Sequence, residues 1–496
     1  MSQLKKLAGQ TAIYGVSTIL GRLLNVLLVP LYTRVLKTGA YGTVTEMYAY
    51  VALLIVLLTY GMETAYFRYC EKRKTNNKDF VYSTSLISLI ISTLVFLFVV
   101  LTLQQNIASV LRYPNHREYI VWFGLIISFD VLTSIPFARL RQEGKAIRFA
   151  SIKITGISIN IGLNLFFILL CPFLIRHHIL VKYVSYVFDG AISVKYIFIS
   201  NLISSSVQLL LLSPQIARIK TGFDFILWKK LIRYALPLLI FGLAGNINEM
   251  LDRILIKYLL PSDISMQQLG IYGACYKISI FMTIFVQAFR YAAEPFFFAQ
   301  SNEKNAKETY AIVMKYFVVV VSFIFLFTMM YLDDFVIYFI GKDFRVGASV
   351  IPILLLANLF LGVFYNLSIW YKLTDKTIFG AYLSLIGAII TIALNVYWIP
   401  RIGYIGSAWA TFICYGSMML LSYFIGQKYY PVNYNLKMIV GTIGLSVFIY
   451  LLSKWIQIDN EFYRILLRTI FLLVFLTIVL FIERKNLKNL GIIKWR

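Results

Sequence analysis

Several charged and amide side chains lie inside long apolar stretches of this sequence. A charge there costs about 2.5–3.5 kcal/mol at the centre of a membrane helix, so each one calls for a functional hypothesis. Arg22 and Asn25 are three residues apart and therefore share one helix face, while Lys153 and Lys277 lie in later stretches. Cations in low-dielectric surroundings attract an anion, and arginine offers a bidentate fork to phosphate-type oxygens. We predict an anion-binding cavity lined by Arg22, Asn25, Lys153, Arg253 and Lys277.

Two of these cations also have purely structural explanations. Lys153 could place its charged end at the membrane interface and leave only its alkyl stem in the apolar region. Arg253 lies on a stripe with Glu249 and Lys257, with Asp252 beside it, and groups at that spacing can neutralise one another in an internal ion-pair ladder. The sequence leaves both alternatives open. Asp130, Glu249 and Asp252 are candidates for coupling transport to H⁺ or Na⁺, and we expect no other cofactor.

The sequence lacks the patterns expected of metal sites and of enzymes. Its four cysteines are widely spaced without a CxxC pattern, and it has three histidines, so we predict neither a disulfide framework nor a metal site. The loops between apolar stretches are short, and Asp333-Asp334 is the one adjacent acidic pair. A catalytic group of residues on a sizeable loop is therefore not indicated, and we expect a transporter and no enzyme.

Composition predicts that these residues are carried by membrane-spanning helices. Apolar residues make up 60% of the 496-residue chain and charged residues 14%, and the mean hydropathy is +0.77. Soluble domains carry about a quarter charged residues, whereas apolar runs of about 20 residues recur along this chain and each can cross a bilayer. The predicted fold is an all-α polytopic membrane protein with about 14 transmembrane helices. The fourteen spans are expected at roughly 11–35, 43–67, 81–103, 119–138, 150–175, 192–213, 234–260, 271–293, 312–332, 347–370, 378–399, 404–425, 437–453 and 465–482.

The distribution of basic residues predicts the orientation. A net charge of +25 could suggest nucleic acid, but the Lys and Arg residues form short clusters between the spans and not one soluble face, so we expect no nucleic-acid partner. With the N-terminus in the cytoplasm, about 29 Lys and Arg lie inside and about 14 outside. We therefore predict a multi-pass protein of the cytoplasmic (inner) membrane with both termini in the cytoplasm.

Two stretches of the chain repeat at one fixed offset of 231 residues. Tyr41-Gly42 and Glu63 match Tyr272-Gly273 and Glu294, and Lys145 to Ile168 match Lys376 to Ile399 at scattered positions. Six predicted spans separate equivalent positions, so the halves should share one orientation and form two lobes around a cavity. The predicted division is an N-terminal six-helix lobe over 1–220, a C-terminal six-helix lobe over 229–430, and two extra transmembrane helices with a cytoplasmic tail over 431–496.

The equivalent acids of the repeat could form a gate. Glu63 and Glu294 lie near the predicted cytoplasmic ends of their spans, with Arg68 and Arg290 close in sequence. Ion pairs across the lobes could form and break there as access to the cavity changes. The alternative is that these four residues only anchor helix ends.

The whole chain resembles the polysaccharide transporters of the multidrug/oligosaccharidyl-lipid/polysaccharide superfamily, the Wzx-type O-antigen and capsule flippases. The segments that carry the resemblance are KLAGQTAIYGVSTILGRLLNVLLVPLYTRVL, AYGTV, MLDRILIKYLL…GIYGACYKIS and ALNVYWIPRIGYIGSAWATFICYG. The resemblance implies two six-helix lobes that open alternately to either side of the membrane. The implied substrate is an undecaprenyl-pyrophosphate-linked oligosaccharide repeat unit for surface polysaccharide (O-antigen, capsule or exopolysaccharide), with a polysaccharide polymerase and a chain-length regulator as further expected partners.

Two rival functions remain open from the sequence. An ion-coupled multidrug exporter of the same superfamily would share the lobes, although such exporters usually carry an acidic residue in the first span, where this chain offers Arg22 and Asn25. A membrane glycosyltransferase, polymerase or acyltransferase would act on the same lipid-linked sugars, but needs the catalytic residues that the sequence lacks.

Overall fold

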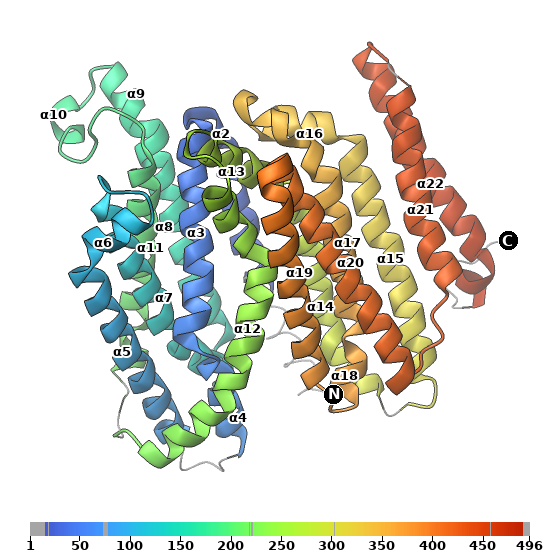
Figure 1. The fold of residues 1–496 in the computed structure, drawn as a ribbon, viewed down its shortest axis with the longest axis horizontal. Coiled ribbons are helices and arrows are strands. Elements are labelled where there is room, and N and C mark those ends of the chain that lie inside the picture. Colours follow the sequence, from blue (N-terminus) through green and yellow to red (C-terminus); the bar gives the residue numbers. More distant parts are fainter. Residues whose placement is uncertain are drawn as a thin grey trace. The chain divides into compact units, whose positions relative to one another are not determined.

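The computed structural model describes residues 15–17, 19–72, 78–217, 219, 222–301, 303–456 and 458–489, and within them it is helical without any strand (Figure 1). Residues 11–14 of the first predicted span and residues 490–496 of the predicted cytoplasmic tail lie outside the described residues. In the described part of the chain, twelve helical spans are long and apolar enough to cross a membrane: Gly15–Val35, Thr38–Glu71, Lys78–Thr102, Arg117–Gln142, Ala146–Arg176, Val194–Ile216, Ala306–Met330, Lys342–Leu373, Ile378–Ile402, Tyr404–Tyr429, Leu436–Trp455 and Glu461–Arg484.

One bent pair of helices raises the count among the described residues to at most thirteen spans, against the predicted fourteen. The pair α13 (Ser262–Tyr276) and α14 (Ile280–Gln300) is bent by 51° and would form one additional span. Helix α12 (Phe225–Leu259) has 35 residues and is long enough to cross a hydrocarbon core, but it is not among the helices that are also apolar enough to do so. The prediction of an all-α polytopic membrane protein is therefore confirmed.

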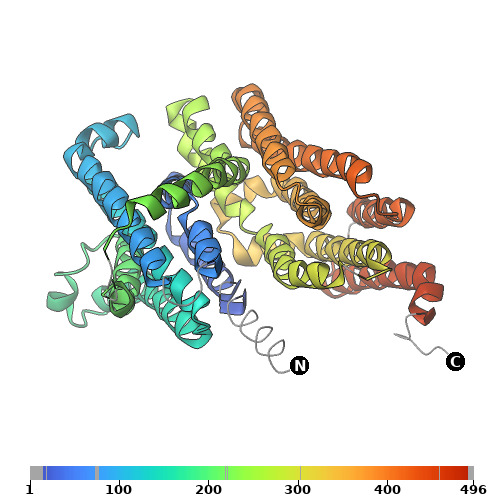
Figure 2. The same cartoon turned by 90° about the horizontal axis from the view of Figure 1, so that it is seen from below.

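The chain divides into two compact units, and their helices can be followed by colour in Figures 1 and 2. The first unit comprises Met1–Ala274 and Thr391–Tyr404, and the second comprises Cys275–Ile390 and Ile405–Arg496. These units are defined by packing and the predicted lobes by the sequence repeat, so the lobe boundaries at 220, 229 and 430 stay a prediction.

The first unit is built on helices that pack side by side along most of their length. Helix α11 packs against α7 and α8, α5 packs against α7, and α12 packs against α3, α4 and α5. The elements of this unit before α12 are α2 (Val29–Val35), α3 (Thr38–Thr59), α4 (Met62–Lys72), α5 (Lys78–Thr102), α6 (Gln104–Val110), α7 (Arg117–Gln142), α8 (Ala146–Leu165), the π-helical turn η1 (Phe166–Leu170), α9 (Cys171–Arg176), α10 (Val181–Val184) and α11 (Val194–Ile216). We refer to the two ends of this unit as the α4 end and the α6 end.

Glycines set the closest approach between α3 and α13 within this unit. A Cβ atom added to Gly42 would lie 2.2 Å from the Met266 carbonyl oxygen, and one added to Gly270 would lie 1.9 Å from the Thr38 carbonyl oxygen. Only glycine fits at such distances, so the two backbones touch directly, as they do at small-residue crossings of membrane helices.

The second unit is organised around α15. This helix packs against α17, α21 and α22, while α14 packs against α15 and α17. Its aromatic core includes Phe364, Trp370 and Tyr415, which are all buried. The elements of this unit after α14 are α15 (Ala306–Met330), α16 (Leu332–Phe339), the 3₁₀ helix η2 (Lys342–Val350), α17 (Ile351–Leu367), α18 (Ile369–Leu373), α19 (Ile378–Ile402, of which the second half belongs to the first unit), α20 (Tyr404–Tyr429), α21 (Leu436–Trp455) and α22 (Glu461–Asn489).

Candidate functional site

A ladder of amide side chains joins the first span to α8. The Asn160 side chain donates to the side-chain amide oxygen of Asn25 at 3.4 Å, and Asn164 donates to the backbone and side-chain oxygens of Asn160 at 2.8 and 3.1 Å. The Tyr32 hydroxyl completes the ladder by donating to Asn164 at 2.8 Å. Asn25, one of the predicted cavity residues, therefore stands at the exposed end of a polar track that leads into the buried interior of the helix pair.

Arg22 lies one helical turn before Asn25 and is exposed. Its helix touches α8, since a Cβ atom added to the neighbouring Gly21 would lie 2.7 Å from the Ile157 side chain. Within the described residues, neither a hydrogen bond nor an ion pair is formed by the Arg22 guanidinium. We therefore expect the Arg22 guanidinium to face water or a ligand, because exposure to lipid would cost several kcal/mol.

Lys153 and Asp130 form a second polar group in the same helix bundle. The Lys153 ammonium lies 4.1 Å from the centre of the Phe137 ring, and Asp130 accepts a hydrogen bond from Ser205 at 2.9 Å. The two charges are near enough to interact, but among the described residues no direct ion pair joins them. Lys153 is half-buried, so the structure keeps a cation inside the bundle that is only partly compensated.

The cation stripe of α12 is neutralised by its neighbours. Arg253 is 5% exposed, its guanidinium lies 3.0 Å from the Asp252 carboxylate, and it also donates to the Glu249 carbonyl oxygen. The other Asp252 oxygen accepts a hydrogen bond from the Tyr272 hydroxyl. The structural alternative, an internal ladder, is thus the arrangement found around Arg253 and Asp252, while the Glu249 side chain remains exposed.

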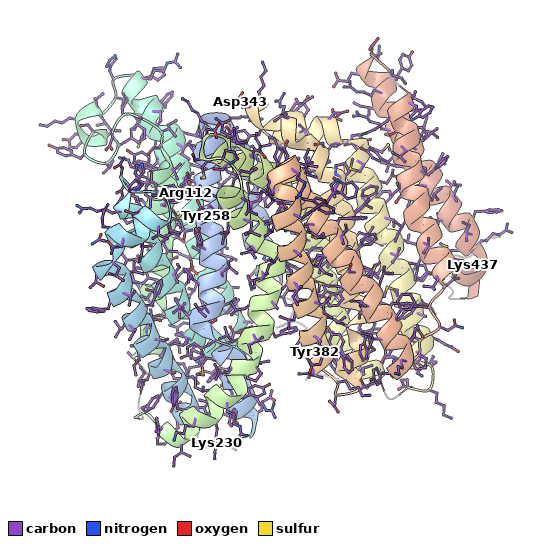
Figure 3. All side chains as sticks on the ribbon, in the orientation of Figure 1. Arg112, Lys230, Tyr258, Asp343, Tyr382 and Lys437 are labelled. Carbon is purple, nitrogen blue, oxygen red and sulfur yellow. The ribbon has the colours of Figure 1, made fainter. Side chains whose placement is uncertain are left out.

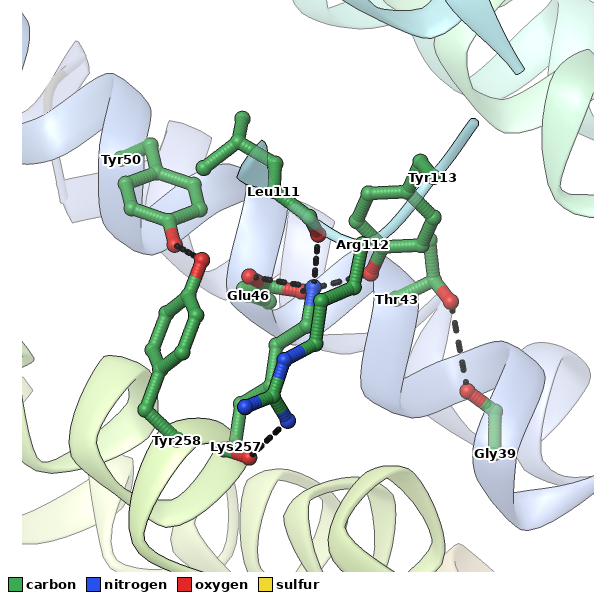
Figure 4. Close-up of polar contacts among 9 residues, drawn as sticks. All are labelled: Gly39, Thr43, Glu46, Tyr50, Leu111, Arg112, Tyr113, Lys257 and Tyr258. Atoms are coloured by element: carbon green, nitrogen blue, oxygen red, sulfur yellow. Dashed lines mark hydrogen bonds and ion pairs between the residues drawn. The ribbon is translucent and has the colours of Figure 1, made fainter. Parts of the chain in front are cut away.

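The last cation of that stripe, Lys257, belongs to a buried cluster at the α6 end (Figure 4). Its ammonium lies 2.8 and 2.9 Å from the two Glu46 carboxylate oxygens and 2.6 Å from the Leu111 carbonyl oxygen. The Tyr113 hydroxyl donates to Glu46 at 2.5 Å. Burial and the Glu46 charge raise the pKa of the Tyr113 phenol, which therefore stays protonated and acts as a donor. Glu46 and Lys257 are 0% and 2% exposed, so this ion pair is dry.

Further contacts extend this cluster between α12 and the segment that follows α6. The Arg112 guanidinium lies 5.0 Å from the centre of the Tyr258 ring and donates to the Lys257 carbonyl oxygen at 3.4 Å. The Tyr50 and Tyr258 hydroxyls are 3.2 Å apart. Arg112 and Tyr258 lie near one end of the unit, and Lys230 lies at the other (Figure 3). Sequence reasoning missed Glu46, although one signal was available, since it is the one acid between residues 38 and 59.

The equivalent acids of the repeat are paired in the same way in the two units. Glu63 pairs with Arg141 in the first unit and Glu294 pairs with Lys372 in the second, and each partner follows its acid by 78 residues. Because the acids are 231 residues apart, their partners are too. The duplication therefore holds for a contact as well as for residue identities.

The arginines predicted beside these acids have different surroundings. Arg68 lies 4.2 Å from the centre of the Tyr234 ring, whereas Arg290 lies 3.2 Å from Glu294 and 4.8 Å from the centre of the Tyr365 ring. Each acid thus has a partner inside its own unit, as anchoring of helix ends requires. A gate with ion pairs across the lobes stays a prediction.

Two remaining predictions concern Lys277 and metal binding. Lys277 lies in the turn between α13 and α14 and is half-buried. Among the residues that the structure describes, no group of three His, Cys, Asp or Glu side chains is placed to hold a metal ion.

Comparison with known proteins assigns the family. The profile of the family described as "Polysaccharide biosynthesis protein" matches residues 7–299, which is more than half of the chain. This chain belongs to the polysaccharide biosynthesis protein family. The resemblance drawn from the sequence is confirmed at the level of this family.

Solved structures of membrane transport proteins share the fold. A structure titled "Lipid II flippase MurJ, inward closed conformation" is 15% identical with a TM-score of 0.67, and the match covers 96% of this chain and 100% of that one. An inward-facing multidrug resistance MATE family transporter of the MOP superfamily is 15% identical with a TM-score of 0.63, covering 82% of this chain and 94% of that one. A MATE transporter in complex with MaD3S is 14% identical with a TM-score of 0.59, covering 86% and 95%. A search of curated proteins finds no match.

Proposed function

We propose that this protein is a flippase that carries undecaprenyl-pyrophosphate-linked oligosaccharide repeat units across the cytoplasmic membrane by alternating access. The observation that carries the proposal is Arg22, an exposed arginine inside an apolar span without a partner among the described residues. Keeping such a charge in a membrane span is unfavourable. The oxygens of a pyrophosphate could offset that cost by accepting two parallel hydrogen bonds from the guanidinium. Membership of the polysaccharide biosynthesis family supports a lipid-linked sugar as the cargo.

The surroundings of Arg22 suit a substrate with both charge and hydroxyl groups. Lys153 adds a second partly compensated cation on α8, and the Asn25–Asn160–Asn164 ladder offers amide donors and acceptors to the sugar hydroxyls. Lys277 is retained as a further candidate contact, while Arg253 is proposed to support the site from its ion pair with Asp252. The cation-rich set favours an anionic headgroup over a cationic drug.

The experiment uses purified protein in liposomes that hold a fluorescent undecaprenyl-pyrophosphate oligosaccharide in both leaflets. Translocation is followed as loss of protection of the inner-leaflet label from a membrane-impermeant reagent. We expect protein-dependent translocation in the wild type and a rate about 10- to 100-fold lower in Arg22→Gln. Arg148→Gln is the matched control, because it removes one exposed cation from the first turn of α8.

Two outcomes of this experiment would contradict the proposal. A wild-type translocation rate in the Arg22→Gln variant would show that Arg22 does not contribute to substrate binding. Absence of translocation, together with efflux of a small organic cation driven by an ion gradient, would assign the chain to the multidrug exporters that share its fold.

We further propose that Asp130 couples transport to an ion gradient. Its carboxylate is hydrogen-bonded to Ser205 and lies near Lys153, so a proton or Na⁺ that binds there would change how well the Lys153 charge is compensated. Asp130→Asn should make translocation insensitive to imposed H⁺ and Na⁺ gradients while the gradient-free rate persists. A gradient response equal to that of the wild type would remove Asp130 from coupling.

Both termini are proposed to face the cytoplasm. The positive-inside bias supports this orientation, and it puts the α4 end on the cytoplasmic side and the α6 end outside. Single cysteines introduced at Lys145 and at Gln105, in a variant without its four native cysteines, test it with an impermeant maleimide on intact cells. If only the cysteine at residue 145 is labelled, the α4 end faces outside and the proposed orientation is wrong.

A further inference from the structure

A polar cavity of about 470 Å³ lies in the second unit, where α16 and the end of α15 meet α21 and α22. It lies apart from Arg22 and Lys153, which belong to the first unit, and no step of the proposed transport uses it. The charged residues that line it are Asp333, Lys454, Asp459, Arg464 and Arg468. Some of these side chains have partners within the protein and others do not.

Arg468 forms one fixed wall of the cavity. Its guanidinium lies 2.9 Å from the Asp333 carboxylate and also pairs with Asp334. Farther along α22, Glu483 forms an ion pair with the buried Lys315 of α15. Helix α22 is therefore fastened to α15 and α16 at two levels, and the cavity beside Arg468 has a rigid frame.

Two donors in the cavity wall lack the partners that buried groups normally have. The Tyr450 hydroxyl and the Arg464 Nε atom are both buried, and neither has a hydrogen-bond partner among the described residues. Tyr450 as a whole is 7% exposed, and the Lys454 ammonium lies 4.9 Å from the centre of its ring. Buried donors in native proteins are almost always satisfied, by protein, water or a ligand. One phenol, one guanidinium and one ammonium around a polar cavity fit a ligand rich in anionic oxygen.

Aromatic side chains place this cavity at the membrane interface. Trp455, Phe462 and Tyr463 surround the turn between α21 and α22 and are 88%, 69% and 57% exposed. Tryptophan and tyrosine collect at the headgroup level of a bilayer, where the phosphates of phospholipids lie. The cavity thus opens at the depth at which an anionic oxygen is most abundant in a membrane.

We propose that this cavity binds the phosphate of a membrane phospholipid, held by Arg464, Lys454 and Tyr450. Asp459 lines the same cavity, is exposed, and has no ion-pair partner in the described part of the chain. Its carboxylate is placed to accept the ammonium of an ethanolamine headgroup. The acid beside the three donors therefore favours phosphatidylethanolamine over phosphatidylglycerol.

The test is native mass spectrometry of the detergent-purified full-length protein after addition of phosphatidylethanolamine, phosphatidylglycerol or inorganic phosphate. We expect at least one tightly retained phosphatidylethanolamine, with about tenfold weaker retention in Arg464→Gln and a smaller loss in Tyr450→Phe, which keeps the ring but removes the hydroxyl. Lys437→Gln is the matched control, because it removes one cation from the opposite end of α21 (Figure 3). Each variant is checked for an unchanged melting temperature.

Three results would overturn the proposal. The first is lipid retention in Arg464→Gln equal to that in the wild type and in Lys437→Gln. The second is displacement of the lipid by millimolar inorganic phosphate, which would make this a site for a free anion. The third is equal loss in all variants including Lys437→Gln, which would assign the retained lipid to non-specific charge.

Discussion

The first span and α12 each carry an arginine among apolar residues, and the fold treats the two arginines in opposite ways. Arg22 is exposed and has no partner among the described residues, whereas Arg253 is buried beside Asp252. Farther along α12, Lys257 is buried against Glu46. An arginine is thus neutralised by an acid in α12 and lacks a described partner in the first span, where we propose that it binds a ligand. Residue type and depth alone do not separate these roles, but the presence of an acid does.

The largest loss of stability is expected at the buried ion pair of Glu46 and Lys257, whose two charges neutralise each other. Lys257→Met leaves the Glu46 carboxylate buried without its cation, and breaking a buried pair on one side typically costs about 3–5 kcal/mol of stability. We expect a markedly lower melting temperature in detergent, measured by fluorescence-detected size exclusion. The double variant Glu46→Gln/Lys257→Met should recover most of the loss, because it removes both charges. A double variant as unstable as the single one would show that the pair is not the cause.

The next effect separates the two arginines by function. Arg22→Gln should lower the translocation rate by about 10- to 100-fold, which corresponds to the about 1.5–3 kcal/mol of hydrogen bonds to a charged group. Its melting temperature should remain that of the wild type. Arg253→Gln should do the reverse and lower the melting temperature more than the rate. Equal effects of the two variants on rate and melting temperature would show that the two arginines have the same role.

A smaller effect is expected at Lys153, whose charge is partly compensated by Asp130. Neutralising it in Lys153→Gln should slow translocation by about fivefold, or about 1 kcal/mol, because its charge acts on the substrate at a distance. The loss should shrink as salt concentration rises, since a screened charge contributes less. A salt-independent loss would favour a purely structural role for Lys153.

The smallest effects should come from the repeated ion pairs. Glu63–Arg141 and Glu294–Lys372 are partly exposed, and such pairs contribute about 0–1 kcal/mol. Glu63→Gln and Glu294→Gln should each shift the melting temperature slightly and by similar amounts. If the pairs only anchor helix ends, transport should stay near the wild-type rate. Loss of transport in either variant, with rescue by exchanging the charges of the pair, would instead show that the pair takes part in transport.

The sequence predicted the helices and the repeat but not the partners of the charged residues. Hydropathy and spacing are local, so they located the spans and put Arg253 and Lys257 on one stripe. They could not show that Arg253 turns to Asp252 beside it while Lys257 reaches Glu46, which is 211 residues away. The offset of 231 residues identified Glu63 and Glu294 as equivalent, yet their partners lie 78 residues farther along the chain. Pairing over such separations follows from packing, which no window of sequence contains.

The contact between Gly42 and Gly270 limits how this sequence can vary. Most lipid-facing positions accept any apolar residue of suitable size, because lipid adapts to their shape. At these two positions a single added carbon would overlap a backbone carbonyl oxygen, so glycine is the one residue that fits. A family profile built on many diverged sequences should therefore lose nearly all residue identity in the spans while these two glycines persist.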